Sequence, residues 1–239
     1  MRERPLDSNT EAFAFAERLF RGEFDMMILL TGVGTRALAK ALESRYPAEA
    51  FPEALRKLTV VARGPKPAAV LREMNVPIAV MVPEPNTWRE LAASLRGRPE
   101  RKIAIQEYGK PNPDFVGALL ARGAEVTTVR VYQWDLPEDL EPLRTAVRNI
   151  AGGSIDVVLF TTSIQVTHLF QVATELGVEK TMLEGLRRAV VASIGPSTSE
   201  ALEDYEIIPD LEPSHPRMGF LVKETADQCA AILDAKQGR

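Results

Sequence analysis

Seven residues recur in this sequence at one ungapped spacing of 131 positions, and this internal repeat constrains the fold more than any other feature. The pairs fall at matching places in the apolar pattern and are Asp25/Asp156, Thr31/Thr162, Leu38/Leu169, Val60/Val191, Gly64/Gly195, Pro65/Pro196 and Leu71/Leu202. A period this long is typical of a duplicated domain, because solenoid repeats span about 20–50 residues. The chain is therefore predicted to contain two similar domains, at about 10–122 and 137–239.

Short apolar runs alternate with helical patterns through both halves, which indicates a parallel α/β sheet in each. The expected strands are 25–30, 58–62, 76–82, 102–106, 155–160 and 189–194, and the 131 offset adds a strand near 207–213 as the counterpart of 76–82. The expected helices are 35–44, 67–74, 88–95, 113–122, 165–176 and 197–204. At the 131 offset the unit 102–123 has no counterpart, because its first residue would map to 233 and the sequence has 239 residues. The second domain is therefore expected to show one strand and one helix fewer, and an open sheet edge.

The segment 124–134 has a different texture, with β-branched residues alternating at period two. It is longer and more polar than a buried parallel strand, so it is predicted to be an exposed antiparallel ribbon or connector. The predicted fold is α/β, with two similar parallel-sheet domains, flavodoxin-like or Rossmann-like, joined by a two-stranded β connector. Residues 1–9 and 123–136 are expected to form that connector.

The charge balance argues against a protein that works by neutralising nucleic-acid phosphates. Lys plus Arg total 29 and Asp plus Glu 33, which gives a net charge of −4. No apolar run approaches the length of a membrane-spanning helix. Cys229 is the single cysteine, so no internal disulfide can form, which suits a cytoplasmic protein. The two histidines, His168 and His215, lack metal-ligand spacing, and no metal site is expected.

Five loops at the predicted carboxyl ends of strands share Gly, Ser, Thr and backbone N–H groups. They are 31–36, 63–66, 108–111, 161–164 and 195–198. Ligands of parallel sheets bind at this edge, and free N–H groups at helix starts attract carboxylate or phosphate. For any one loop, simple helix capping explains the composition. Facing one another across two domains, however, the five loops would form a cleft suited to a ligand with several anionic groups.

The run Gly32-Val-Gly-Thr-Arg-Ala37 fits the dinucleotide fingerprint, because it follows a strand and opens a helix. Arg63, after the next expected strand, could read the 2′-phosphate of NADP. Against this, the repeat partner Ser163–His168 has no glycine. An NADP-dependent oxidoreductase therefore stays an alternative.

Several segments, in order and spacing, resemble the uroporphyrinogen-III synthase family. The run Ala192–Leu202 is similar to the family's strand, Gly-Pro-Ser/Thr-Thr turn and helix, and Val129–Gln133 resembles the segment that carries its active-site tyrosine. Thr31–Gly34 and Tyr108–Pro111 resemble the loops of bacterial members. The resemblance extends over nearly the whole chain. It also implies that an N-terminal βα unit, which we expect this chain to lack, fills the place left open in the second domain.

The resemblance implies a lyase that closes hydroxymethylbilane to uroporphyrinogen III, with loss of water and inversion of ring D, in haem biosynthesis. A non-catalytic sensor that keeps the fold and binds tetrapyrrole or other polyanions is a second alternative. Tyr132 and Thr198 are the implied catalytic residues. The residues expected to bind the eight carboxylates of the substrate are Thr31, Gly32, Val33, Gly34, Arg36, Arg63, Gly64, Lys66, Tyr108, Gly109, Lys110, Thr162, Ser163, Ile164, Gly195, Pro196 and Ser197. Because the negative net charge cannot attract an octa-anion, the attraction must come from local dipoles and from the cations Arg36, Arg63, Lys66 and Lys110. The resemblance also implies that no metal or organic cofactor is needed. We expect a cytoplasmic monomer with no nucleic-acid or membrane partner.

Overall fold

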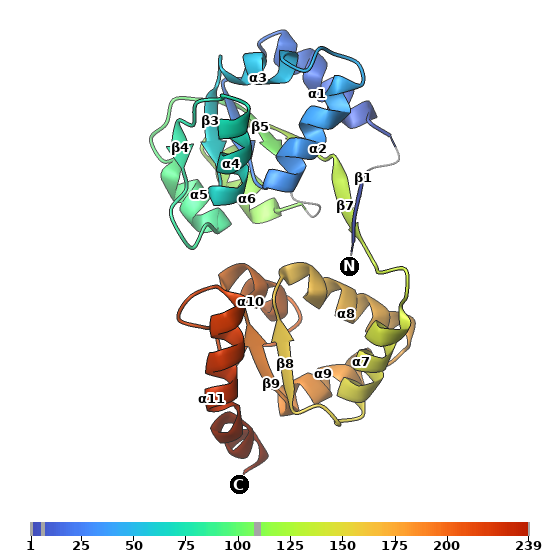
Figure 1. The fold of residues 1–239 in the computed structure, drawn as a ribbon. Helices are drawn as coiled ribbons and strands as arrows, with labels where there is room; N and C mark the ends of the chain where they lie inside the picture. Colours follow the sequence, from blue (N-terminus) through green and yellow to red (C-terminus); the bar gives the residue numbers. More distant parts are fainter. Residues whose placement is uncertain (1, 6–7, 108–110, 239) are drawn as a thin grey trace. The chain divides into compact units, whose positions relative to one another are not determined.

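The computed structural model of the protein describes residues 2–5, 8–107 and 111–238 (Figure 1). The chain divides into two compact units, a first unit of residues 3–134 and a second unit of residues 135–239 with 1–2. The first unit contains α1 (Thr10–Phe20), β2 (Met26–Leu29), α2 (Gly32–Glu43), α3 (Ala50–Leu55), β3 (Thr59–Ala62), α4 (Pro65–Glu73), β4 (Val80–Met81), α5 (Trp88–Ser94), β5 (Lys102–Gln106), α6 (Pro113–Ala121) and β6 (Glu125–Val129). The second unit contains α7 (Glu141–Ala151), β8 (Val157–Phe160), α8 (Ser163–Glu175), α9 (Glu179–Arg188), β9 (Val190–Ser193), α10 (Pro196–Glu203) and α11 (Met218–Gln237). Strands β1 (Arg2–Pro5) and β7 (Tyr132–Asp135) pair in a small sheet of their own.

The sheet of the first unit has the strand order β4-β3-β2-β5-β6, and all neighbours run parallel. The prediction for residues 124–134 is therefore wrong in its first half. Strand β6 pairs in parallel register along the whole of β5, from Glu125 beside Lys102 to Val129 beside Gln106. Its alternating pattern arises because β6 is an edge strand, whose side chains are only partly covered. Only β7, in the second half, joins the two-stranded sheet.

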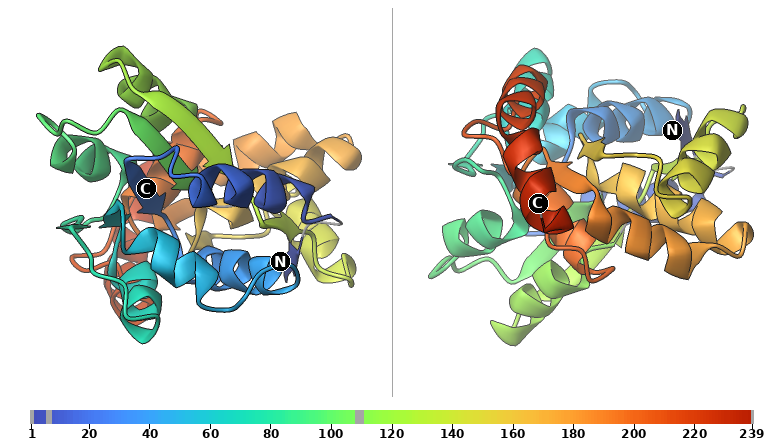
Figure 2. Two further views of the ribbon diagram at one scale, coloured as in Figure 1. Left: turned by 90° about the horizontal axis from the view of Figure 1, so that it is seen from above. Right: turned by 90° about the horizontal axis from the view of Figure 1, so that it is seen from below.

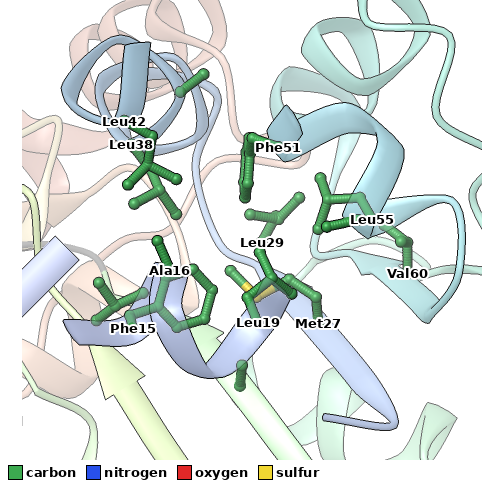
Figure 3. Close-up of a cluster of buried hydrophobic side chains, with 14 of the residues drawn as sticks. Phe15, Ala16, Leu19, Met27, Leu29, Leu38, Leu42, Phe51, Leu55 and Val60 are labelled. Carbon is green, nitrogen blue, oxygen red and sulfur yellow. The ribbon is translucent and has the colours of Figure 1, made fainter. Parts of the chain in front are cut away.

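Helices cover both faces of this sheet. One face packs against α1, α2, α3 and α4, where Phe15, Leu38 and Phe51 meet Met27 and Leu29 of the central strand (Figure 3). The other face packs against α5 and α6. Strand β2 lies at the centre with all four of its residues buried, which is the pattern expected of a parallel strand covered on both faces.

The second unit repeats this pattern at the same offset. Strand β8 corresponds to β2 and β9 to β3, residue for residue, and the pair is again parallel. Helix α7 corresponds to α1 in the same way. Even the pairing of β3 with β4 at Val61 and Val80 has its counterpart, an isolated bridge between Ala192 and Leu211. Helix α11, red in Figures 1 and 2, packs against β9 and β8.

The units differ in how many strands they hold. Within the described residues, the second unit has two named strands and a single bridge, whereas the first has five. The expected difference of one strand was too small, because β6 joins the first sheet and the strand expected near 207–213 shrinks to the bridge at Leu211. The strand expected at 76–82 likewise shortens to Val80–Met81.

Candidate active site

The segment predicted as the loop 31–36 is mostly the first turn of α2. Thr31 has extended backbone angles and caps the helix, and its hydroxyl accepts the backbone N–H of Gly34 at 3.0 Å. The helix therefore begins at Gly32, three residues earlier than expected. The same correction applies to Pro65 and Lys66 in α4, to Ser163 and Ile164 in α8, and to Pro196 in α10. Ser197 and Thr198 lie in the first turn of α10, within the helix expected at 197–204. These residues stand at helix N-termini, where unpaired N–H groups favour an anion.

Close packing requires the two glycines of this turn. A Cβ atom on Gly32 would lie 2.8 Å from the backbone oxygen of Lys66. A Cβ atom on Gly34 would overlap the side-chain amide of Gln106. The fingerprint Gly32–Ala37 is thus explained by the contact of α2 with the start of α4 and with the end of β5, without a dinucleotide.

Tyr132 lies against the same turn. Its hydroxyl is 3.2 Å from the Thr31 hydroxyl, and its ring meets Trp134 edge-on at 6.1 Å. The residue is only 3% exposed and belongs to the core of the first unit. The expectation of an exposed ribbon is therefore wrong for Tyr132, whose phenol is held at the carboxyl end of β2.

The predicted cations differ in their surroundings. The guanidinium of Arg36 forms an ion pair with Glu73 at 2.6 Å, which raises the pKa of Arg36 and lowers that of Glu73. Both side chains are more than half exposed, so the pair is weak and can exchange for another anion. Lys66 is exposed at the first turn of α4. Arg63 precedes Gly64, the capping residue of that helix, and is partly buried.

Two residues of this edge were missed by the sequence reasoning. Gln106 is fully buried at the end of β5, where its side-chain oxygen accepts the N–H of Thr31 at 3.3 Å. The Glu107 carboxyl follows it, 3.8 Å from the guanidinium of Arg130. Burial raises the pKa of Glu107, Arg130 partly opposes the rise, and Glu11 adds to it. The sequence signal that could have identified them is a pair of polar residues at the end of an otherwise apolar strand.

The second unit presents the matching edge. Thr162 caps α8 with extended backbone angles but without a side-chain hydrogen bond, Ser163 is partly buried, and Ile164 is buried. In the turn before α10, the Ser193 hydroxyl accepts the N–H of Gly195 at 3.2 Å and lies 2.8 Å from the Ser199 hydroxyl, which also bonds Glu212. Thr198 is 3% exposed, and Ser197 is exposed. Ser193, Ser199 and Glu212 were not predicted; they fix the turn that carries the expected residues.

Three predicted residues, Tyr108, Gly109 and Lys110, lie outside the described residues. Among those described, no group of three or more His, Cys, Asp or Glu side chains is arranged to hold a metal ion. In the same part of the chain, no helix combines the length and the apolar character needed to cross a membrane.

Comparison with known proteins identifies one family. The family model described as uroporphyrinogen-III synthase HemD matches residues 1–223. A putative uroporphyrinogen-III synthase of Methanothermobacter thermautotrophicus is 30% identical over 77% of this chain and 71% of its own length. The uncharacterized protein YjjA of Bacillus subtilis is 31% identical over 84% of this chain and 75% of its own length. The crystal structure of a mutant uroporphyrinogen III synthase from Thermus thermophilus matches with a TM-score of 0.72 and 27% identity, covering 97% of this chain and 87% of that one.

Proposed function

We propose that this chain, which belongs to the uroporphyrinogen-III synthase family, works through the helix N-termini at the carboxyl ends of its two parallel sheets. It is a lyase of haem biosynthesis that closes hydroxymethylbilane to uroporphyrinogen III. The reaction releases one water and inverts ring D. The oxidoreductase and sensor alternatives have no support from the family match, and close packing accounts for the glycines that suggested the first.

Tyr132 is our candidate for the proton donor. The bond between the substrate's hydroxymethyl carbon and its oxygen breaks, the oxygen keeps the bonding pair, takes the phenol proton and leaves as water. The substituted carbon of ring D then attacks the cationic azafulvene and forms a spiro intermediate. A positioned proton donor contributes about 10²–10⁴ in rate. Holding the flexible chain so that ring D attacks at its substituted carbon is orientation catalysis.

The substrate carboxylates are proposed to bind at the capping turns of α2, α4, α8 and α10. Each turn presents backbone N–H groups at the positive end of a helix, and Lys66 and Arg36 add exposed cations beside two of them. Thr198, at the start of α10, is the second candidate catalytic residue, either binding substrate or placing a proton. The observation that carries the proposal is the hydrogen bond between Tyr132 and the capping residue Thr31.

We further infer that the two units are similar α/β domains joined by the β1–β7 ribbon, in a cytoplasmic monomer. The repeated elements at the 131 offset and the separate two-stranded sheet support this organisation. The lone Cys229 is compatible with a reducing compartment.

A coupled assay tests the function. Hydroxymethylbilane is made in situ, and the products are oxidised and resolved into isomers I and III. We expect isomer III to rise in proportion to added protein, whereas isomer I alone would contradict the proposal. Titration with NADPH, followed spectrophotometrically, is expected to show no saturable binding.

A further inference from the structure

The Thr31 hydroxyl already has partners within the first unit. It accepts the Gly34 N–H at 3.0 Å and lies 3.2 Å from the Tyr132 hydroxyl. The Thr31 backbone oxygen accepts both the N–H and the hydroxyl of Thr35, at 3.0 and 2.7 Å. Its N–H points to Gln106. Because each polar atom of Thr31 has a hydrogen-bond partner, its hydroxyl is held in a fixed position beside Tyr132.

We propose that Thr31 is a positioning residue that acts through Tyr132, by donating its hydroxyl proton to the phenol oxygen. A threonine hydroxyl has one proton to donate and two lone pairs to accept with. The Gly34 N–H can only donate, so it uses one lone pair and leaves the hydroxyl proton free to point at Tyr132. The phenol then keeps its own proton for the leaving hydroxyl of the substrate. This inference rests on the proposed role of Tyr132.

The direction of the chain of hydrogen bonds favours proton release. Donation runs from the backbone of α2 to Thr31 and from Thr31 to Tyr132, so each bond strengthens the next. When the phenol gives up its proton, the negative charge that forms on its oxygen faces a donor at the positive end of α2. The O···O distance of 3.2 Å is long for a hydroxyl pair, and catalytic hydrogen bonds often shorten only when substrate is bound.

Packing holds the pair in place. Tyr132 is buried in the core of the first unit, and the side chain of the fully buried Gln106 accepts the Thr31 N–H and lies next to Gly34. Together these contacts distinguish Thr31 from a residue whose hydroxyl is available to bind substrate directly. Its hydroxyl is engaged with protein groups on both sides.

Three substitutions at one position separate capping from donation. Thr31→Val removes both, Thr31→Ser keeps both, and Thr31→Asp keeps a capping oxygen but cannot donate. We expect Thr31→Val to lower kcat about 10- to 100-fold, as loss of a hydrogen bond to a charged group does, with KM little changed. Thr31→Ser should restore most of the rate, and Thr31→Asp should fold well yet stay slow.

Thr87→Val is the matched control. Thr87 caps α5 in the same unit, is buried, and accepts the N–H of Arg89. We expect it to lower the melting temperature about as much as Thr31→Val does, without changing kcat. Equal losses of kcat in the two variants would mean that the effect is structural, and would overturn the inference.

A double-mutant cycle tests the route through Tyr132. In a Tyr132→Phe background, Thr31→Val should cost no further kcat. Additive losses, mainly in KM, would assign Thr31 to substrate binding instead and overturn the proposal. If Tyr132→Phe leaves kcat unchanged, Tyr132 takes no part in the reaction. Any loss of kcat in Thr31→Val would then arise by another route.

The hydrogen bond itself has a readout independent of activity. The chain has 4 tyrosines, so 3-fluorotyrosine labelling gives a small set of ¹⁹F signals, and Tyr132→Phe identifies the one from Tyr132. Thr31→Val and Thr31→Asp should shift this signal, whereas Thr31→Ser and Thr87→Val should leave it in place. No shift with Thr31→Val would contradict the bond even if the proposed function holds.

Discussion

The central strands of the two units occupy equivalent places in the repeat but different surroundings. Strand β2 is flanked by β3 and β5, and each of its four residues is buried. Strand β8 pairs with β9 alone among the described strands, and only Phe160 is buried. Ile28 is 0% exposed, while its counterpart Leu159 is 39% exposed. The same βα pattern therefore yields a closed core in one unit and an open strand edge in the other.

The two capping threonines extend the comparison to the chemistry. Thr31 and Thr162 occupy the same repeat position, and both have extended backbone angles before a helix. Only the Thr31 side chain caps its helix, and Thr31 also meets Tyr132. The repeated scaffold supplies helix N-termini in both units, whereas the proposed proton donor belongs to the first unit.

The largest stability difference should come from the central strands. Ile28→Ala is expected to cost about 2–5 kcal/mol of unfolding free energy, and Leu159→Ala less than about 1 kcal/mol, because a half-exposed side chain leaves no cavity. Both tryptophans, Trp88 and Trp134, lie in the first unit, so their fluorescence in urea reports that unit. Circular dichroism follows the helices of both. Equal losses of unfolding free energy in Ile28→Ala and Leu159→Ala would mean that β8 is as well covered as β2.

A substitution in the first turn of α2 should change the free energy of unfolding by less. Gly34→Ala places a methyl group against Gln106 and should cost roughly 1–3 kcal/mol, as overpacking does. The equivalent position in the second unit holds Gln165, so the constraint belongs to the first unit alone. Gly117→Ala, in α6 with no atom near the added carbon, is the control and should stabilise by about 0.5–1 kcal/mol. A neutral Gly34→Ala would contradict the packing explanation of the glycines.

The smallest expected change in unfolding free energy comes from substituting Asp25, which is compared with its repeat counterpart Asp156. The Asp25 carboxylate accepts the N–H groups of Lys102 at 2.9 Å and Arg101 at 3.0 Å, and these bonds lower its pKa. A lowered pKa means that the stabilisation is present above the unfolded pKa of about 4 and is lost as the pH falls below it. Because Asp25 is exposed, Asp25→Asn should cost less than about 1 kcal/mol at pH 7.

Asp156 is the internal control for this pair. It is exposed, and within the described residues its carboxylate has no hydrogen-bond partner. Asp25→Asn should flatten the pH dependence of unfolding between pH 3 and 7, whereas Asp156→Asn, which removes no hydrogen bond, should leave the urea midpoint at pH 7 unchanged. Identical urea midpoints for both variants across this range would contradict the difference.

The central strands of both units and the helices that follow them were predictable, because their apolar runs alternate regularly and the repeat fixes their correspondence. Five helices were not among the expected elements, namely α1, α3, α7, α9 and α11. Strand β6 was not, since a half-covered edge strand in a parallel sheet carries the same period-two pattern as an exposed ribbon. Helix starts were placed too late because Gly32, Pro65 and Pro196 were assigned to loops, although proline is favoured at a first helical position.

The pairing of Thr31 with Tyr132 could not be predicted from periodicity, because 101 residues separate them and they contact each other only in the folded first unit. The family resemblance pointed to Tyr132, whereas the period-two pattern of 124–134 predicted an exposed ribbon for its segment. Gln106 was detectable in principle, as a polar residue at the end of the apolar strand 102–106. Its role depends on the absence of a side chain at Gly34, which is a tertiary contact.

The rate of uroporphyrinogen III formation by Tyr132→Phe, compared with Tyr205→Phe, tests the central claim most directly. Tyr205 lies in the second unit, stacked on Phe170 at 3.8 Å, and its replacement by phenylalanine keeps that contact. The account predicts that Tyr132→Phe slows isomer III formation by about 10²–10⁴ without abolishing it, while Tyr205→Phe leaves the rate unchanged. Equal rates of isomer III formation by wild type and Tyr132→Phe would contradict it.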